Sequence, residues 1–359
     1  MSKIYVAILG ATGAVGQRFI QLLEHHPWFR VAEVVASDRS AGKPYAEAAR
    51  WVLHGQPPSD VANLMVKPLD AAIESPIVLS ALPGEIAKTL ELELAARGHV
   101  VSSNTSSHRM APDVPILIPD LNADHVGLVD VQRQKRGWTS GALVTMSNCT
   151  SVPLVVAMAP LVKYGIQKAN VVSMQAISGA GYPGVASLDI LDNVVPYIGG
   201  EEEKVEIEPR KMLGKLAGDE IALLDTVISA SCNRVPVIDS HLVVASLSFE
   251  HVPSLDQIKA DWERYTGHDL VRGLPSAPNP IITYTETADR PQPRRDREAG
   301  AGMTTTIGRL RPCPILDVKF VALSHNTIRG AAGGAILNAE LLLAQGYVQG
   351  VGSVALAAN

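Results

Sequence analysis

The stretch of the chain best suited to chemistry is residues 146–154, where Cys149 stands among small polar residues and is followed by an apolar run. The run at 154–162 predicts a buried helix that ends near Gly165, and Pro153 suits its first turn because proline lacks an N–H there. Cys149 would then lie at or just before a helix N-terminus, where free N–H groups and the dipole favour a thiolate. A thiolate is a strong nucleophile, so Cys149 is the candidate nucleophile; the alternative is an inert buried cysteine.

Two further segments carry side chains that could hold a substrate and move a proton. Arg234 and His241 flank a proline-containing stretch, and His241 opens an expected strand at 242–249. Glu208 and Lys211 stand three residues apart on an expected helix, so both can reach the same side. Most of the acidic run at 201–208 is expected to be a solvated helix face.

Arg109 and Gln175 are weaker candidates by residue type alone. Arg109 lies in a polar turn after an expected strand at 100–102, and it is either an anion binder or an ordinary surface arginine. Gln175 belongs to an alternating strand at 171–178, and it either points into a site or satisfies a sheet neighbour.

The N-terminal segment predicts a dinucleotide-binding turn. An apolar strand at 3–9 is followed by Gly10, Gly13 and Gly16 and then by an expected helix at 17–26. This order lets backbone N–H groups approach a pyrophosphate at the helix N-terminus. Because the glycines stand between a strand and a helix, we favour a dinucleotide site over a tight turn that binds no ligand. A second buried strand at 77–80 ends in a turn with Ala81 and Leu82, and such turns line the cofactor crevice of a doubly wound sheet.

The turn after the next expected strand, at 32–36, indicates which nicotinamide cofactor binds. Asp38 could bond the ribose hydroxyls of NAD, but Ser37, Arg39 and Ser40 crowd the same turn. A guanidinium fork with hydroxyls suits a 2′-phosphate, so we favour NADP(H) over NAD.

Composition supports a globular enzyme and excludes several other classes of protein. Apolar residues make up 47% of the 359 residues and charged ones 19%, which allows a sizeable core and favours two domains. The net charge of −5 comes without a basic block for nucleic acid, and no apolar run is long enough to cross a membrane. Three scattered cysteines predict neither disulfides nor a metal site, and no signal peptide is recognised, so we expect a cytoplasmic protein.

Five motifs occur in one order along the chain. They are the glycine turn at 10–16, Ser147-Asn148-Cys149-Thr150, the segment 175–181, Asn233-Arg234 with His241, and Asn326 followed by Arg329-Gly-Ala-Ala-Gly. With this set the sequence resembles the aspartate-semialdehyde dehydrogenase family, particularly its archaeal and fungal branch, from Ile4 to Leu343. It departs from the family pattern at Met146-Ser147, at 151–153 and at Leu242.

The resemblance implies an α/β fold with three parts. These are a Rossmann-type NADP-binding domain at 1–148, an α+β catalytic and oligomerisation domain at 149–324, and a C-terminal helix within 325–359 that packs back on the first domain. A homodimer or homotetramer is implied, with a small-molecule substrate and neither nucleic acid nor membrane as a partner. The glycine- and alanine-rich helix at 330–344 suits close packing on another element.

The resemblance also implies a role for each candidate residue. Cys149 would be the nucleophile, His241 the acid/base, and Gln175 would orient the reacting groups. Arg234 would hold the substrate carboxylate, Glu208 its amino group, and Arg109 and Lys211 its phosphate. The cofactor would be bound by Gly10, Thr12, Gly13, Ala14, Val15, Ser37, Arg39, Ser40, Ala81, Leu82, Ser178, Gly179 and Asn326.

The expected reaction is the reversible NADPH-dependent reduction of aspartyl phosphate to aspartate semialdehyde through a thioester on Cys149. A thioester accepts hydride more readily than an ester or an amide does, which explains the need for a thiol. The alternatives are a reductase of an acyl-CoA such as malonyl-CoA, an N-acetylglutamyl-phosphate reductase, and a nucleotide-binding regulator that has lost catalysis.

Overall fold

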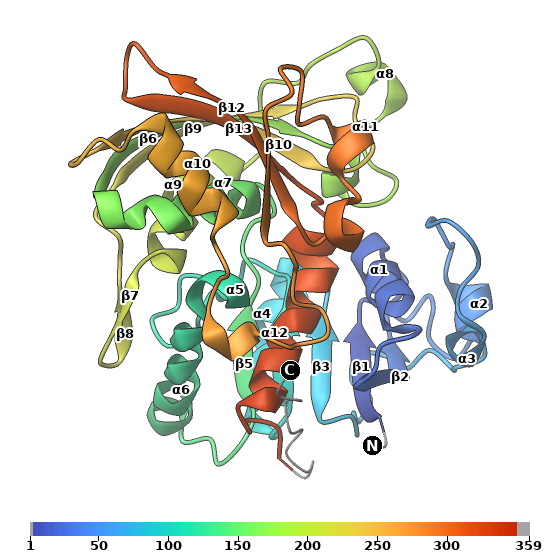
Figure 1. The fold of residues 1–359 in the computed structure, drawn as a ribbon. Helices are drawn as coiled ribbons and strands as arrows, with labels where there is room; N and C mark the ends of the chain where they lie inside the picture. Colours follow the sequence, from blue (N-terminus) through green and yellow to red (C-terminus); the bar gives the residue numbers. More distant parts are fainter. Residues whose placement is uncertain (1–2, 350–359) are drawn as a thin grey trace.

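Two large sheets, each with its own helices, make up residues 3–349, the part of the chain that this computed structural model describes (Figure 1). The first sheet is formed by residues before Met146 and the second by residues after Gly165. The α/β architecture expected from the resemblance is therefore confirmed. Among the described residues, no helix is both long and apolar enough to cross a membrane.

The first sheet is parallel throughout and has the strand order β2-β1-β3-β4-β5. Its strands are β1 (Ile4–Leu9), β2 (Phe29–Val35), β3 (Ile77–Ser80), β4 (Val100–Ser103) and β5 (Ala142–Thr145). β1, β3 and β5 are nearly continuous apolar runs because helices cover both faces of the sheet, while β2 carries Arg30 and Glu33. In β1, Val6 and Ile8 face the core with α1 (Ala14–Leu23), while Ala7 and Leu9 face α4 (Gly84–Ala96). The helix expected at 17–26 begins and ends three residues earlier, and it starts within the glycine segment, directly after Gly13.

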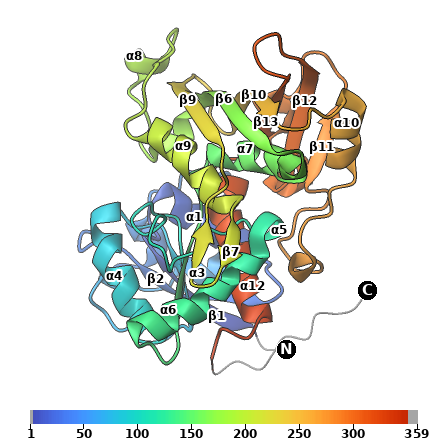
Figure 2. The ribbon, with the colours of Figure 1, turned by 90° about the vertical axis from the view of Figure 1, so that its left-hand side faces the viewer.

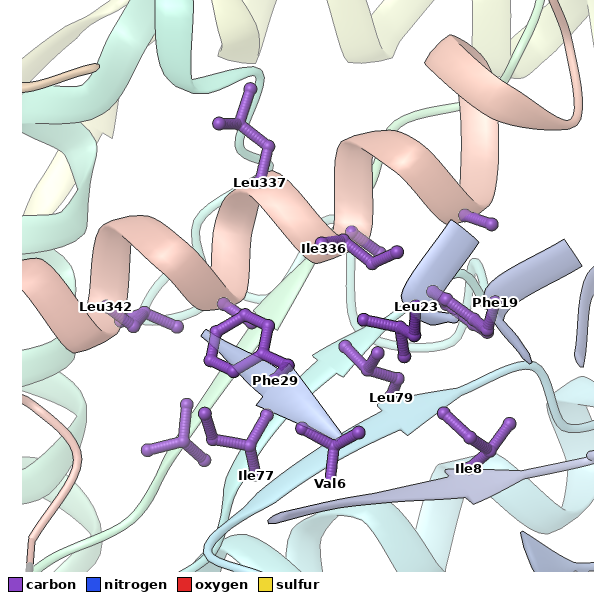
Figure 3. Packing of buried hydrophobic residues seen from close by; sticks show 14 of the residues in the cluster. Val6, Ile8, Phe19, Leu23, Phe29, Ile77, Leu79, Ile336, Leu337 and Leu342 are labelled. Carbon is purple, nitrogen blue, oxygen red and sulfur yellow. The ribbon is translucent and has the colours of Figure 1, made fainter. Parts of the chain in front are cut away.

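The C-terminal helix α12 (Gly333–Ala344) returns to this first sheet (Figure 1). Figure 3 shows Ile336 and Leu342 over the strand residues Val6 and Ile77. Every α12 residue from Gly333 to Leu343 is buried, and its Glu340 accepts a 2.7 Å hydrogen bond from His26. Residues 350–359 of the expected C-terminal part lie outside the described residues.

The second sheet is mixed and has the order β11-β12-β13-β10-β6-β9 (Figure 1). Its strands are β6 (Ile166–Gln175), β9 (Val227–Arg234), β10 (His241–Phe249), β11 (Ile282–Thr285), β12 (Thr305–Pro312) and β13 (Val318–Ser324). In β10, alternate residues such as Val243 and Ala245 are buried against α7 (Ser151–Met158) and α10 (Leu255–Glu263), and the residues between them are only half-buried. The helix expected after Cys149 is present: α7 starts at Ser151, and its last turn tightens before Gly165.

The remaining elements are short, apart from α6 and α9. They are α2 (Tyr45–Ala48), α3 (Ser59–Ala62), α5 (Pro119–Asn122), α6 (Leu128–Arg136), β7 (Lys215–Ala217), β8 (Glu220–Ala222), α8 (Ser187–Ile190), α9 (Glu201–Met212) and α11 (Pro293–Asp296). Figure 2 shows the β7–β8 hairpin extending from the second sheet toward the first domain, where Asp219 pairs with Lys135 of α6.

Candidate active site

Cys149 and His241 meet where the two sheets join. Cys149 lies between β5 and α7, His241 is the first residue of β10, and Cys149 Sγ is 3.1 Å from His241 Nε2. The backbone N–H of Ala176 donates to His241 Nδ1 at 3.1 Å. Because that nitrogen accepts a hydrogen bond, a neutral ring carries its proton on Nε2, pointing at the sulfur.

The charge state of the pair differs from what the helix start suggested. Burial and the Glu201 carboxylate raise the pKa of Cys149 to about 12, against the opposing effects of Arg109 and Arg234. Burial, followed by the nearby Arg234 guanidinium, lowers the pKa of His241 to about 3. The free site therefore holds a thiol beside a neutral imidazole, because desolvation outweighs the helix dipole.

Arg234 comes to this pair from β9, the strand next to β6. Its Nη1 donates to the carbonyl of Ala176 at 2.7 Å. Gly179 leaves the space beside it open: a Cβ on Gly179 would lie 2.7 Å from Arg234 Nη1 and 3.2 Å from His241 Nε2. The expected carboxylate binder Arg234 and the expected acid/base His241 thus both lie against Gly179.

Arg109 and Glu208 form a buried ion pair beside the nucleophile. Arg109 Nη1 donates to Glu208 Oε1 at 2.9 Å, and Nη2 donates to the carbonyl of Asn104. The other Glu208 oxygen accepts the backbone N–H of Asn148 at 2.6 Å. Arg109 is therefore no ordinary surface arginine, and Glu208 belongs to the same cluster as the nucleophile's own turn.

Lys211 and Gln175 have contacts other than those expected of them. Lys211 Nζ donates to the carbonyls of Arg109, Ala111 and Val114, each at 2.7 Å, and burial lowers its pKa to about 8. All three of its N–H bonds are used, so direct contact with a phosphate requires one to be exchanged. Gln175 is buried and its amide donates to Ser173 Oγ at 3.3 Å, with no hydrogen bond to the Cys–His pair among the described residues.

The glycine turn has the shape that a dinucleotide requires. Gly10 has φ of +72°, and a Cβ on Gly16 would lie 2.3 Å from the Gly10 carbonyl oxygen, so only glycine fits either position. The first-turn N–H groups of Ala14 and Val15 have no carbonyl partner within α1. Thr12 and Gly13 precede them, and the β3 exit turn lies against Gly10, whose added Cβ would be 2.5 Å from the Ala81 oxygen and near Leu82.

A cavity of about 210 Å³ connects this turn to the second domain, with Ala14 and Arg18 on one side and Ser178 and Asp239 on the other. Asn326 Nδ2 donates to Ser178 Oγ at 2.9 Å, and Asn326 Oδ1 accepts the backbone N–H of Ser240. Asn326 and Ser178, which are expected to bind the nicotinamide, therefore lie next to Ser240, the residue before His241. The turn that follows β2 carries Ser37 and Arg39, which are exposed, and Ser40, which is half-buried.

Some residues of the site went unrecognised in the sequence. Asn148 is 4% exposed, its backbone N–H and side-chain amide make four hydrogen bonds around the nucleophile, and Glu201 holds its side chain. The available signal was the seven-residue spacing of Glu201 and Glu208, which puts both on one helix face. No group of three or more His, Cys, Asp or Glu side chains within residues 3–349 is arranged to hold a metal ion.

A parallel nucleotide-binding sheet joined to a second domain with a close Cys–His pair is the arrangement of a nicotinamide-dependent oxidoreductase. Family models agree: the semialdehyde dehydrogenase NAD-binding domain matches residues 5–129, and the semialdehyde dehydrogenase dimerisation domain matches 158–329. The chain belongs to the aspartate-semialdehyde dehydrogenase family.

The relatives are similar over nearly their whole length. The chain is 48% identical to the aspartate-semialdehyde dehydrogenase of Archaeoglobus fulgidus, over 94% of this chain and 97% of that one. It is 47% identical to the Schizosaccharomyces pombe enzyme, over 96% and 99%. The structure matches aspartate semialdehyde dehydrogenase with NADP from Candida albicans with a TM-score of 0.89 at 39% identity, over 97% of this chain and all of that one (100%).

Proposed function

We propose that the protein catalyses the reversible reduction of L-aspartyl 4-phosphate to L-aspartate 4-semialdehyde and phosphate with NADP(H). The observation that supports this most is the 3.1 Å approach of Cys149 Sγ to His241 Nε2 beside two buried arginines. The reaction belongs to the biosynthesis of lysine (through diaminopimelate), threonine and methionine.

The first step is attack of the Cys149 sulfur on the acyl carbon. The C–S bond forms, the C–O bond to phosphate breaks, and the thiol proton leaves with the phosphate. His241 Nε2–H donates to the sulfur while it carries negative charge, both in this step and when the C–S bond later breaks to release the aldehyde. The free sulfur then regains a proton from water.

The charged groups around the sulfur match the charges of the substrate. Arg234 is proposed to hold the carboxylate in its guanidinium fork, and Arg109 the phosphate. Glu208 is proposed to receive the amino group, since a carboxylate can accept about four hydrogen bonds and two of its positions are taken. Lys211 adds positive charge behind Arg109, and Gln175 stays a proposed orienting residue.

NADP(H) fits the glycine turn and the cavity behind it. When bound, its nicotinamide supplies the hydride that reduces the thioester. Ala14 and Val15 would bind the pyrophosphate through their free N–H groups, and Arg39 the 2′-phosphate. Ser178, Gly179 and Asn326 would orient the nicotinamide end, close to Cys149 and His241.

The nearest alternative is an acyl-CoA reductase, which needs the same thiol, histidine and cofactor but no acid for an amino group. A rate comparison between aspartyl phosphate and malonyl-CoA for the native chain and Glu208→Gln separates the two. We expect turnover of aspartyl phosphate alone, and a loss of about 10-fold or more in Glu208→Gln, since a charge-assisted hydrogen bond contributes roughly 1.5–3 kcal/mol. Faster turnover of malonyl-CoA, unaffected by the substitution, would favour the alternative.

The assembly is proposed to be a homodimer or homotetramer formed through the second domain. The match of residues 158–329 to a dimerisation domain supports an oligomer. A cytoplasmic location is proposed on the ground that all three cysteines are free thiols, as is usual in a reducing compartment.

A further inference from the structure

Helix α9 turns its acidic side chains inward, toward an edge strand and the nucleophile. Glu206 accepts the backbone N–H of Ala230 and Glu202 that of Cys232, each at 3.0 Å. These two residues belong to β9, an outer strand of the second sheet, whose outward N–H groups would otherwise be unpaired. The expectation of a solvated acidic face holds for Glu203, which is exposed, but not for the helix as a whole.

Two other acids of α9 hold Asn148, the residue immediately before the nucleophile. Glu208 Oε2 accepts its backbone N–H at 2.6 Å, and Glu201 Oε2 accepts its side-chain N–H at 2.8 Å. Glu201 and Glu208 are two helical turns apart, so they bind the same residue from one helix face. Lys204 orients the other Glu201 oxygen at 3.1 Å.

The side chain of Asn148 links Glu201 to the turn that carries Cys149, because it is hydrogen-bonded to both. Its Oδ1 accepts the backbone N–H groups of Thr150 at 2.8 Å and Ser151 at 3.3 Å, so it closes the turn that leads into α7. Cys149 lies inside this bonded loop. If Nδ2 of Asn148 lost its acceptor, the amide could rotate, and the turn and the sulfur would move with it.

We propose that Glu201 is a positioning residue for the nucleophile, acting through the side-chain amide of Asn148. The inference rests on the proposed function, in which Cys149 attacks the acyl carbon. Nothing in that mechanism brings Glu201 into contact with the substrate. Its role is to fix the angle at which Sγ meets the acyl carbon, and misplacement by about 1 Å can lower a rate by about 100-fold.

The charge of Glu201 has a second effect, which is separate from positioning: it raises the pKa of the Cys149 thiol. Glu201 is the leading charge that raises the pKa of Cys149, while Arg109 and Arg234 lower it, and His241 faces the sulfur from β10. Removal of the carboxylate charge therefore shifts the reactivity of the thiol to lower pH, whether or not Asn148 stays bonded. This shift reports the charge of Glu201 alone, whereas kcat and the double variant report its positioning of Asn148.

The test compares Glu201→Ala, Glu201→Gln, Asn148→Ala, the double variant Glu201→Ala/Asn148→Ala, and Glu203→Ala. Glu203 is the matched control, because it shares the first turn of α9 but is exposed. Steady-state kinetics give kcat and KM, thermal unfolding reports folding, and iodoacetamide labelling of Cys149 against pH, read by peptide mass spectrometry, reports the thiol. The labelling needs no turnover, so it remains informative if aspartyl phosphate proves not to be the substrate.

Glu201→Ala is expected to lower kcat by about 10- to 100-fold with little change in the KM for NADPH. Glu201→Gln keeps an oxygen for Asn148 Nδ2 and should recover most of that rate, while both variants shift the labelling profile to lower pH. The double variant should be no slower than Asn148→Ala, since the two residues act as one unit. Equal losses in the Ala and Gln variants, or losses that multiply in the double variant, would overturn the proposal. Native kcat in Glu201→Ala would also overturn it, whatever the labelling profile shows.

Discussion

Gly330 lies directly against the nucleophile, and a Cβ at Gly330 would be 2.8 Å from the Cβ of Cys149. Gly330 belongs to a π-helical turn, Ile328–Ala332, that precedes α12. Such turns are uncommon and often occur at functional sites. The turn that leads into the returning helix α12 thus packs directly on Cys149.

Gly330→Ala is expected to displace Cys149 and to lower kcat by about 100-fold, because the clash is with backbone and Cβ atoms that cannot rotate away. The measurement is steady-state turnover, with circular dichroism to confirm the fold. Gly199→Ala is the control, since its added Cβ would meet nothing closer than 3.8 Å. Equal activity of both variants would contradict this packing.

Arg39→Ala is expected to raise the KM for NADPH by about 10-fold or more and to leave the KM for NADH nearly unchanged. The reason is the loss of a charge-assisted hydrogen bond to the 2′-phosphate, which contributes roughly 1.5–3 kcal/mol. Arg30→Ala, on the exposed side of β2, controls for general charge. If the two cofactors were affected equally, Arg39 would have no part in their discrimination.

Stability should fall as the pH drops below about 6.5, the unfolded pKa of histidine. Burial lowers the pKa of His125, of His241 to about 3, and of His325 to about 4. Between these values and 6.5 the unfolded chain binds protons that the folded chain does not bind. Each histidine therefore lowers the free energy of unfolding by up to about 1.4 kcal/mol per pH unit. Urea unfolding at pH 7.5 and 5.5 measures the difference.

The same unfolding experiment on His325→Asn should give a weaker dependence on pH. Carboxylates with lowered folded pKa, such as Glu33, add their own loss only below about 4.5, outside this window. A free energy of unfolding that is the same at both pH values would rule out neutral buried histidines.

The ion pair of Arg329 with Asp120 should be the most sensitive electrostatic contact near the site. Both side chains are 1% exposed. Arg329→Met leaves a buried carboxylate unpaired and is expected to destabilise the fold by about 3–5 kcal/mol, and Arg329→Met/Asp120→Asn should recover part of that loss. Arg272→Ala, which breaks an exposed pair with Asp269, should change stability by less than about 1 kcal/mol in urea unfolding. If Arg329→Met and Arg272→Ala lowered the free energy of unfolding by similar amounts, the claim that the Arg329–Asp120 pair is buried would be contradicted.

Local sequence patterns predicted the elements whose partners are close in the chain. The strand expected at 3–9, the glycine turn and the helix start after Cys149 follow from apolar runs and from Gly and Pro positions, and the structure has the strand at Ile4–Leu9. The family resemblance implied that Cys149, His241 and Arg234 act together. In the structure Cys149 Sγ is 3.1 Å from His241 Nε2, and Arg234 and His241 both lie against Gly179.

Long-range contacts decided the rest. The acids of α9 point inward because β9 offers them unpaired N–H groups, a partner that no helix pattern reveals. The thiol stays protonated because burial and Glu201 outweigh the helix start. Lys211 is bound by three carbonyls from a loop about 100 residues earlier in the chain.

The central claim is that the Cys149 sulfur forms a covalent acyl bond. The most direct test is phosphate-dependent oxidation of aspartate semialdehyde by Cys149→Ala, with NADP and with His241→Ala as a companion, after NADPH binding has been verified by fluorescence. We predict no turnover above background in Cys149→Ala, a loss of about 100-fold or more in His241→Ala, and intact cofactor binding in both. Native activity in Cys149→Ala would contradict the covalent route.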